Sequence, residues 1–206
     1  MIHTANRRGK QKGFTLVEML IVIIIIGIVA AIVYPLINNG ITSKSNAQKM
    51  MSVSQNIVRS IALMNQTMRS PTTVTSNPLT ASGNTMLDAV IMGDKVAGII
   101  SSTYAPRYTT SGIRNMSDAV IVVTQPSAGS PGVYMIGDSI LSLVNINSRQ
   151  IGVQLTNVPT DQVQEIFQNR EGGGTFDPAT TRTTGVVRFT AVSGTTHPTL
   201  TLVYDL

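Results

Sequence analysis

The chain has 206 residues, of which 42% are hydrophobic and only 12% charged, with a formal net charge of +5. Four cations (Arg7, Arg8, Lys10 and Lys12) precede residue 13, so the other 11 basic residues face 10 acidic ones. This near balance argues against a nucleic-acid-binding domain, which needs a basic face. The absence of cysteine excludes disulfides, thiolate metal sites and a cysteine nucleophile.

The first 37 residues change abruptly from polar to apolar. Residues 1–13 are basic and contain no acid, whereas Phe14 to Ile37 are almost wholly apolar, with Glu18 as the only charge. A helix of about 23 residues is roughly 35 Å long, enough to cross a hydrocarbon layer of about 30 Å. The pattern predicts a transmembrane helix over 14–37, with the basic cluster on the cytoplasmic side.

Residues 38–70 predict an amphipathic continuation of this helix. Ile57, Ile61, Met64 and Met68 recur at helical spacing among polar neighbours. We therefore expect one long helix from about Phe14 to Arg69, ended by the Ser70–Pro71 pair. A domain must cover its apolar stripe.

Residues 71–206 predict that domain. A loop (71–84) comes first, followed by a helix over 85–100 that Gly93 and Gly98 weaken. A second helix follows Asn157, with Thr160 as N-cap and Val163, Ile166 and Phe167 facing inward. Gly172–Gly174 begin a flexible loop. Apolar β-branched runs predict strands at 119–124, 132–136, 140–146 and 152–155, and a closing hairpin of 185–192 with 199–204. The fold class is α+β, with a long N-terminal helix packed on a C-terminal domain that contains an antiparallel sheet.

No catalytic, cofactor or metal site emerges from the remaining residues, and we do not expect an enzyme. The three glycines at 172–174 lack the lysine of a phosphate loop, and His3 and His197 lie at opposite ends of the chain. Asp88 and Asp94 flank the predicted 85–100 helix and are expected to be solvated. A calcium site near Asp138 would need a carboxylate-rich loop, which is missing. The threonines of 175–184 and 193–201 are expected on the sheet surface.

An ordinary secretory signal or a simple membrane anchor would explain the apolar length of the N-terminus. An ordinary signal, however, is cut after its apolar region at an Ala-x-Ala site, and Ala30-Ala31-Ile32 is a poor version of one. A generic anchor has no reason to contain a glutamate near one end. The segment Lys12-Gly13-Phe14-Thr15-Leu16-Val17-Glu18, followed by the apolar run with Gly27 and Pro35, instead resembles the type IV pilin signature.

The resemblance implies a specific processing and assembly site. In that family a prepilin peptidase cuts after the glycine, here Gly13, and the new N-terminal residue, here Phe14, is N-methylated. The family's assembly glutamate corresponds to Glu18, which pairs with the terminal amine of a neighbouring copy. Gly27 and Pro35 match positions at which helix-weakening residues make the family's helix flexible in the filament.

A second resemblance covers Leu155-Thr-Asn-Val-Pro-Thr-Asp-Gln-Val-Gln-Glu-Ile-Phe167. This segment is similar to the Asn-Val-Pro helix of type IVb pilins. Those proteins usually have a cysteine in this helix, and this chain has none. The subclass, IVa or IVb, therefore stays open.

The sequence predicts a structural subunit of a type IV pilus. Residues 1–13 would be the cleaved leader, 14–37 the transmembrane and assembly helix, 38–70 its amphipathic continuation, and 71–206 the periplasmic, later extracellular, domain. The implied partners are other copies in a helical homopolymer, the prepilin peptidase, the membrane, and the inner-membrane assembly platform with its ATPase. The alternatives are a pseudopilin of a type II secretion or DNA-uptake filament, and a bitopic membrane enzyme.

Overall fold

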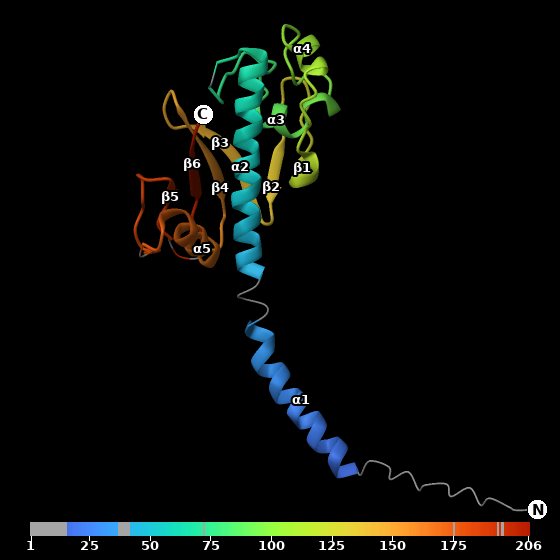
Figure 1. Ribbon diagram of the computed structural model, residues 1–206, viewed down its shortest axis with the longest axis vertical. Helices are drawn as coiled ribbons and strands as arrows, with labels where there is room; N and C mark the ends of the chain where they lie inside the picture. Colours follow the sequence, from blue (N-terminus) through green and yellow to red (C-terminus); the bar gives the residue numbers. More distant parts are fainter. Residues whose placement is uncertain (1–15, 37–41, 72, 175, 193, 195) are drawn as a thin grey trace, which may run out of the picture. The chain divides into compact units, whose positions relative to one another are not determined.

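The computed structural model describes residues 16–36 and 42–206, except 72, 175, 193 and 195, with the side chains of the first helix described up to residue 29 (Figure 1). The chain divides into two compact units, Met1–Thr42 and Ser43–Leu206. Each unit is described by itself.

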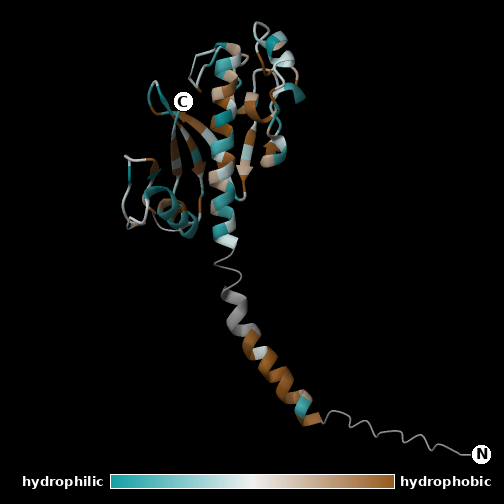
Figure 2. Cartoon of the chain, in the orientation of Figure 1, coloured by the Kyte–Doolittle hydropathy of each residue, from teal (hydrophilic) through white to brown (hydrophobic). Residues whose placement is uncertain are grey.

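The first unit contains helix α1 (Leu16–Leu36), which is apolar on all sides (Figure 2). The exposed fraction of its large hydrophobic side chains ranges from 47% at Met19 to 84% at Leu16. Among the described residues, no helix combines the length and the apolar character needed to cross a membrane. The predicted continuity with the next helix depends on residues 37–41, which lie outside the described residues.

The second unit is built on helix α2 (Thr42–Met68), which runs along one face of the sheet (Figure 1). The predicted stripe is confirmed, since Ile57, Ile61, Met64 and Met68 are all 0% exposed. Burial of side chains at this helical spacing fixes which side of α2 faces the sheet. The stripe also begins earlier than predicted, with Ala47, Met50 and Val53 buried.

The sheet has six strands in the order β1-β2-β3-β4-β6-β5, and every neighbouring pair is antiparallel. This confirms the α+β class and the predicted antiparallel sheet. The strands are β1 (Ile121–Thr124), β2 (Val133–Ile136), β3 (Ser139–Asn145), β4 (Gln150–Thr156), β5 (Val187–Phe189) and β6 (Leu200–Asp205). The last two form the predicted closing hairpin.

The two faces of the sheet differ because strand residues alternate in direction. The inner face contributes the buried side chains of the core, among them Tyr134, Leu141, Val153 and Leu202. Their neighbours along the strands, such as Met135, Ile140, Gln154 and Thr201, face the other way and are at least partly accessible. The domain core therefore lies between α2 and one face of the sheet only.

The predicted helix over 85–100 is wrong in extent. Helix α3 spans only Met86–Ile91, and a short 3-10 turn follows at Gly93–Lys95. Gly93 has a φ of +39°, and a Cβ there would collide with the Tyr108 hydroxyl. This left-handed, tightly packed position stops the helix. Tyr108 lies on α4 (Ala105–Thr110), a helix that the sequence analysis did not predict.

The predicted helix after Asn157 is confirmed as α5 (Thr160–Glu171), with Val163, Ile166 and Phe167 buried. Thr160 is not its N-cap, as predicted, but its first helical residue. Pro159 stands at the cap position, and its carbonyl accepts hydrogen bonds from the N–H groups of Gln162 and Val163, the third and fourth residues of the helix. The left-handed Gly172, with a φ of +74°, ends the helix.

Candidate assembly site

The predicted assembly residues lie on or next to α1. Glu18 occupies the first turn of this helix and is exposed among apolar neighbours. An acid in a first turn interacts favourably with the positive end of the helix dipole. The predicted cleavage and methylation residues, Gly13 and Phe14, lie outside the described residues.

The two predicted flexible positions are both inside the helix. α1 continues through Gly27 and ends one residue after Pro35. No neighbouring atom lies within 4 Å of a Cβ built on Gly27, so packing in this chain does not require a glycine there. A loosening of the helix at these positions in a filament stays a prediction.

Asp88, which was predicted to be solvated, is instead fully buried. Its exposed fraction is 0%. It accepts hydrogen bonds from the Tyr134 hydroxyl at 2.6 Å and the Gly132 N–H at 2.8 Å. The Thr85 N–H and hydroxyl donate to its other oxygen at 2.7 and 2.9 Å. Burial and the Asp88 carboxylate raise the pKa of Tyr134.

Asp88 thus joins α3 to strand β2. Thr85 and Asp88 form a reciprocal capping box at the start of α3, and the same carboxylate holds Gly132 and Tyr134. The Thr-x-x-Asp spacing was the sequence signal that would have found the cap. The link to Tyr134 had no such signal, since it spans 46 positions. Asp94, by contrast, is exposed as predicted.

A second polar cluster closes the loop between α5 and β5. Glu171 forms an ion pair with Arg182 at 2.8 Å and accepts hydrogen bonds from the N–H groups of Val186 and Val187, both at 3.1 Å. The Arg182 guanidinium also stacks over the Phe167 ring at 4.8 Å. We call these residues the Glu171–Arg182 clasp.

Three aromatic rings pack under the clasp. Phe189 lies 5.9 Å from Phe167 and 5.0 Å from Phe176, measured between ring centroids, in edge-on geometry. Such pairs add to the free energy gained by burying the rings. The clasp and these rings hold the C-terminal part of the domain without a disulfide.

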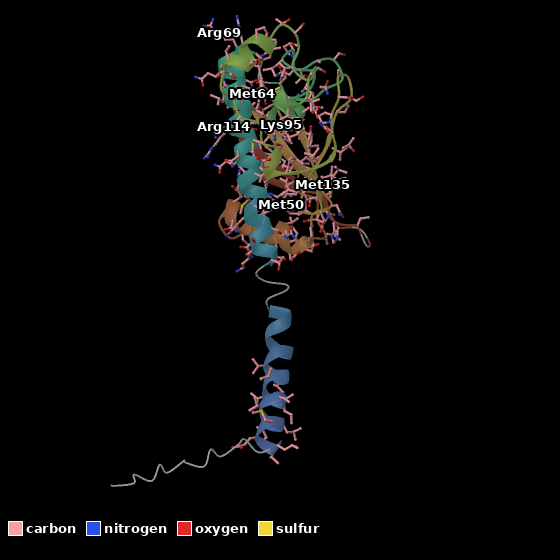
Figure 3. The ribbon with its side chains drawn as sticks, turned by 90° about the vertical axis from the view of Figure 1, so that its right-hand side faces the viewer. Met50, Met64, Arg69, Lys95, Arg114 and Met135 are labelled. Atoms are coloured by element: carbon pink, nitrogen blue, oxygen red, sulfur yellow. The ribbon has the colours of Figure 1, made fainter. Side chains whose placement is uncertain are left out.

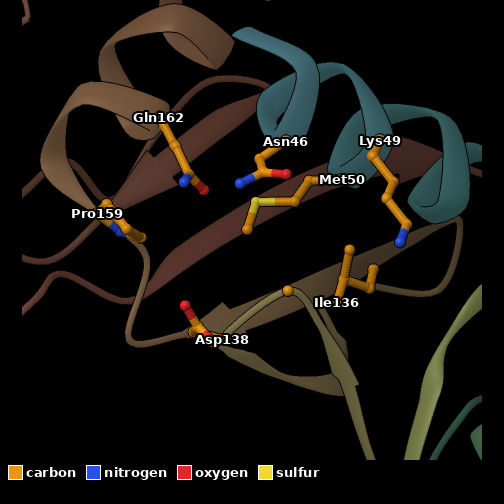
Figure 4. A pocket seen from close by; sticks show the side chains of 8 residues that line it. Asn46, Lys49, Met50, Ile136, Asp138, Pro159 and Gln162 are labelled. Carbon is orange, nitrogen blue, oxygen red and sulfur yellow. The ribbon is translucent and has the colours of Figure 1, made fainter. Parts of the chain in front are cut away.

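A small cavity of about 40 Å³ lies where α2, the β2–β3 turn and α5 meet (Figure 4). Asn46 and Met50 line it from α2, Asp138 from the turn and Gln162 from α5. The Gln162 side-chain oxygen is buried without a hydrogen-bond partner among the described residues. A cavity of this size holds a few water molecules at most, so it suits hydration of Gln162 better than an organic ligand.

The comparisons with known proteins bear on the N-terminus. Residues 8–34 match the family model of the prokaryotic N-terminal methylation motif. This chain carries that motif. The matched range contains Gly13, Phe14, Glu18 and Gly27, four of the five residues that the sequence analysis selected. Searches among curated proteins and among solved structures found no match to the chain.

The motif is the class III signal of type IV pilins and pseudopilins, so the first resemblance is confirmed. The match supports the interpretation of the chain as a pilin-like or pseudopilin-like prepilin. The match ends at residue 34 and does not extend to the domain. The similarity of the α5 segment to type IVb pilins thus stays a prediction.

Proposed function

We propose that this chain is a structural subunit of a type IV pilus. Prepilin peptidase cuts it between Gly13 and Phe14 and methylates the new terminus, and the subunit polymerises through its N-terminal helix. The observation that carries the proposal is the methylation motif at residues 8–34, with an acid in the first turn of an otherwise apolar helix.

The exposed apolar surface of α1 supports polymerisation. Its large side chains, from Leu16 to Val29, are all about half exposed or more in the isolated chain. A helix that is hydrophobic on every side needs apolar surroundings, either lipid or other helices. We propose that lipid surrounds it in the precursor, anchored in the inner membrane with its domain in the periplasm, and other copies of α1 in the extracellular fibre.

Glu18 would set the register between copies. Removal of the leader creates a positive amine on Phe14, and a carboxylate in hydrocarbon costs about 2.5–3.5 kcal/mol on insertion scales. Two opposite charges about 4 Å apart attract by about 4 kcal/mol at an effective dielectric constant near 20. An amine of an axially shifted neighbour therefore offsets the cost of burying Glu18. The peptidase, the assembly platform and its ATPase are the partners that this route requires.

The proposal is tested with Glu18→Gln and Glu18→Ala in the full chain, expressed with the assembly machinery. Both variants should be processed at Phe14 but should form few or no fibres, because the register contact is lost. Mass spectrometry of sheared fibres from the parent chain should show a methylated Phe14. Normal fibre yield with Glu18→Ala, or a retained leader in the working protein, would disprove the proposal.

The same experiment separates the pilus from the pseudopilin alternative. Long surface fibres made of this chain support the pilus. If the mature chain begins at Phe14 but no surface fibres form, and if deletion stops the release of secreted enzymes, the chain is a pseudopilin. An unprocessed N-terminus would favour a membrane enzyme instead.

A further inference from the structure

Three polar side chains form a row across the C-terminal half of the sheet. Arg188 of β5 and Gln154 of β4 are both direct partners of Thr201 of β6. Directly opposite residues of antiparallel strands have neighbouring side chains on one face of the sheet. This is the outward face, and Figure 3 shows Met135 of the same face on the side of the sheet away from α2. We call Arg188, Thr201 and Gln154 the polar row.

The polar row lines a groove of about 300 Å³ in the outward face. Thr199, two positions before Thr201 along the chain, lines one side of the row. Val144 lines the opposite side, because it pairs with Gly152, two positions before Gln154 on β4. The other residues that line the groove include Ile146, Thr181, Thr183 and Thr190. The groove therefore has a hydroxyl-rich part and a smaller apolar part.

Arg188 gives the groove a positive charge that no described residue neutralises. Arg182 also lines the groove, but its guanidinium is paired with Glu171 at 2.8 Å. The Arg188 Nε donates a hydrogen bond to the Gly185 carbonyl at 3.2 Å, and its two terminal nitrogens have no partner among the described residues. None of the described residues that line the groove is acidic. The terminal N–H groups of Arg188 are thus available to an anion.

Neutral polar groups beside Arg188 are available as well. The Gln154 side-chain oxygen accepts a hydrogen bond from the Ser142 hydroxyl at 3.3 Å, which leaves the amide NH₂ group for another acceptor. The Thr190 hydroxyl accepts the Thr199 N–H at 2.9 Å and keeps its own proton to donate. The hydroxyls of Thr199 and Thr201 form no hydrogen bond with a described residue. Each hydroxyl can both donate and accept, so the lining suits a ligand that is itself rich in hydroxyls.

The charge and the polar groups together select a class of ligand. One guanidinium balances one carboxylate and donates two parallel hydrogen bonds to it. A phosphate group carries about −1.5 to −2 charges, more than one arginine compensates. An amino acid would bring an ammonium group, for which the described lining has no acid. A plain aliphatic acid would use the arginine but not the hydroxyls.

We infer that this groove binds a single sugar acid. The carboxylate accepts hydrogen bonds from Arg188, the ring hydroxyls bond with Thr201 and Gln154, and the C–H face of the ring contacts Val144 and Ile146. A volume of about 300 Å³ is at the lower end of the range for ligand pockets, which suits one ring rather than a chain of sugars. The inference concerns the domain alone and does not rest on the proposed function.

Ligand-observed NMR with sodium glucuronate tests the inference on the full chain, held in a detergent that has no sugar group. Glucuronate should bind with a Kd of about 1 mM, because one side of the groove is open to solvent. Glucose has the same ring without the carboxylate and should bind about tenfold more weakly, as should inorganic phosphate. Equal binding of glucose would overturn the inference, and so would tighter binding of phosphate.

Substitutions in the groove show whether these residues form the site. Arg188→Gln should weaken glucuronate binding about tenfold and leave glucose binding unchanged, because only the contact with the carboxylate is lost. Thr201→Val keeps the shape of the side chain but removes its hydroxyl, so it should weaken the binding of both sugars about threefold.

Arg107→Gln is the matched control, since Arg107 is exposed on α4 and does not line the groove. It should leave the binding of glucuronate unchanged. The melting temperature of each variant shows that the domain is still folded. Glucuronate binding that is as tight in folded Arg188→Gln as in the parent chain would overturn the inference.

Discussion

Helices α1 and α2 belong to one chain but differ in how far their apolar side chains are buried. α1 is apolar on all sides and exposes these residues, whereas α2 has one apolar stripe that its own domain buries completely. The comparison shows that the domain stabilises α2 within one copy, whereas the described side chains of α1 keep their apolar surface exposed. In the proposed function, a processed subunit keeps its folded domain while its first helix exchanges lipid for other copies.

The largest expected effect comes from replacing one isoleucine of each helix by alanine. Ile61 is 0% exposed and Ile24 is 52% exposed. Ile61→Ala should lower the free energy of unfolding of the domain by about 2–5 kcal/mol because it leaves a cavity. Ile24→Ala should change it by less than about 0.5 kcal/mol. Urea unfolding of the full chain in detergent, followed by tyrosine fluorescence, measures both, and equal losses would contradict the division into two units.

The next largest effect concerns Asp88, the buried acid whose hydrogen bonds all come from its own domain. Asp88→Ala should lower the free energy of unfolding by about 3 kcal/mol, because the buried Tyr134 hydroxyl and Gly132 N–H lose their acceptor. Tyr134→Phe is the matched control, since it removes one of these hydrogen bonds and leaves no hydroxyl buried. It should cost about 1 kcal/mol. If the two variants were equally stable, the buried network would not hold α3 to β2.

A smaller effect is expected at the Glu171–Arg182 clasp, at the edge of the same domain. Arg182→Met keeps an apolar chain over Phe167 but loses the partly exposed ion pair, so it should cost about 1 kcal/mol. Proteases should cut the loop between α5 and β5 faster in this variant. Arg149→Met, in the exposed β3–β4 turn, is the control and should leave cleavage unchanged.

A further effect is visible only in alkaline solution. Burial, with a contribution from Asp94, raises the pKa of Tyr108 from 10.0 to about 12. The folded domain therefore holds this proton more tightly than the unfolded chain, and the resulting stability is present below pH 10 and lost as the pH rises toward 12. Between these pH values, the melting temperature should decrease less in Tyr108→Phe than in the parent chain. An identical decrease would show that Tyr108 does not ionise with unfolding.

The patterns that could be predicted from sequence were local. Ile57, Ile61 and Met64 identify the buried side of α2 because helical periodicity places them together, and alternation identifies the strands. The motif around Glu18 was recognisable because its residues stand at fixed offsets. Thr160 was wrongly assigned as the N-cap because threonine is a common cap residue, whereas here the helix begins at Thr160 and Pro159 occupies the cap position without a side-chain cap.

By itself, the sequence determined the α+β class, the methylation motif and the faces of the main helix and strands, because each depends on residues close together along the chain. Only the tertiary structure decided that Asp88 is buried against Tyr134 and that Glu171 forms an ion pair with Arg182. It also decided that Gly93, just after α3, packs against the Tyr108 hydroxyl. Likewise, it decided that Leu63 is exposed while Ile61 is buried, and that Ile121, Met135 and Ile140 are aligned on the outer face of the sheet. These outcomes depend on which distant segments pack together, and a pattern of neighbouring residues does not contain that information.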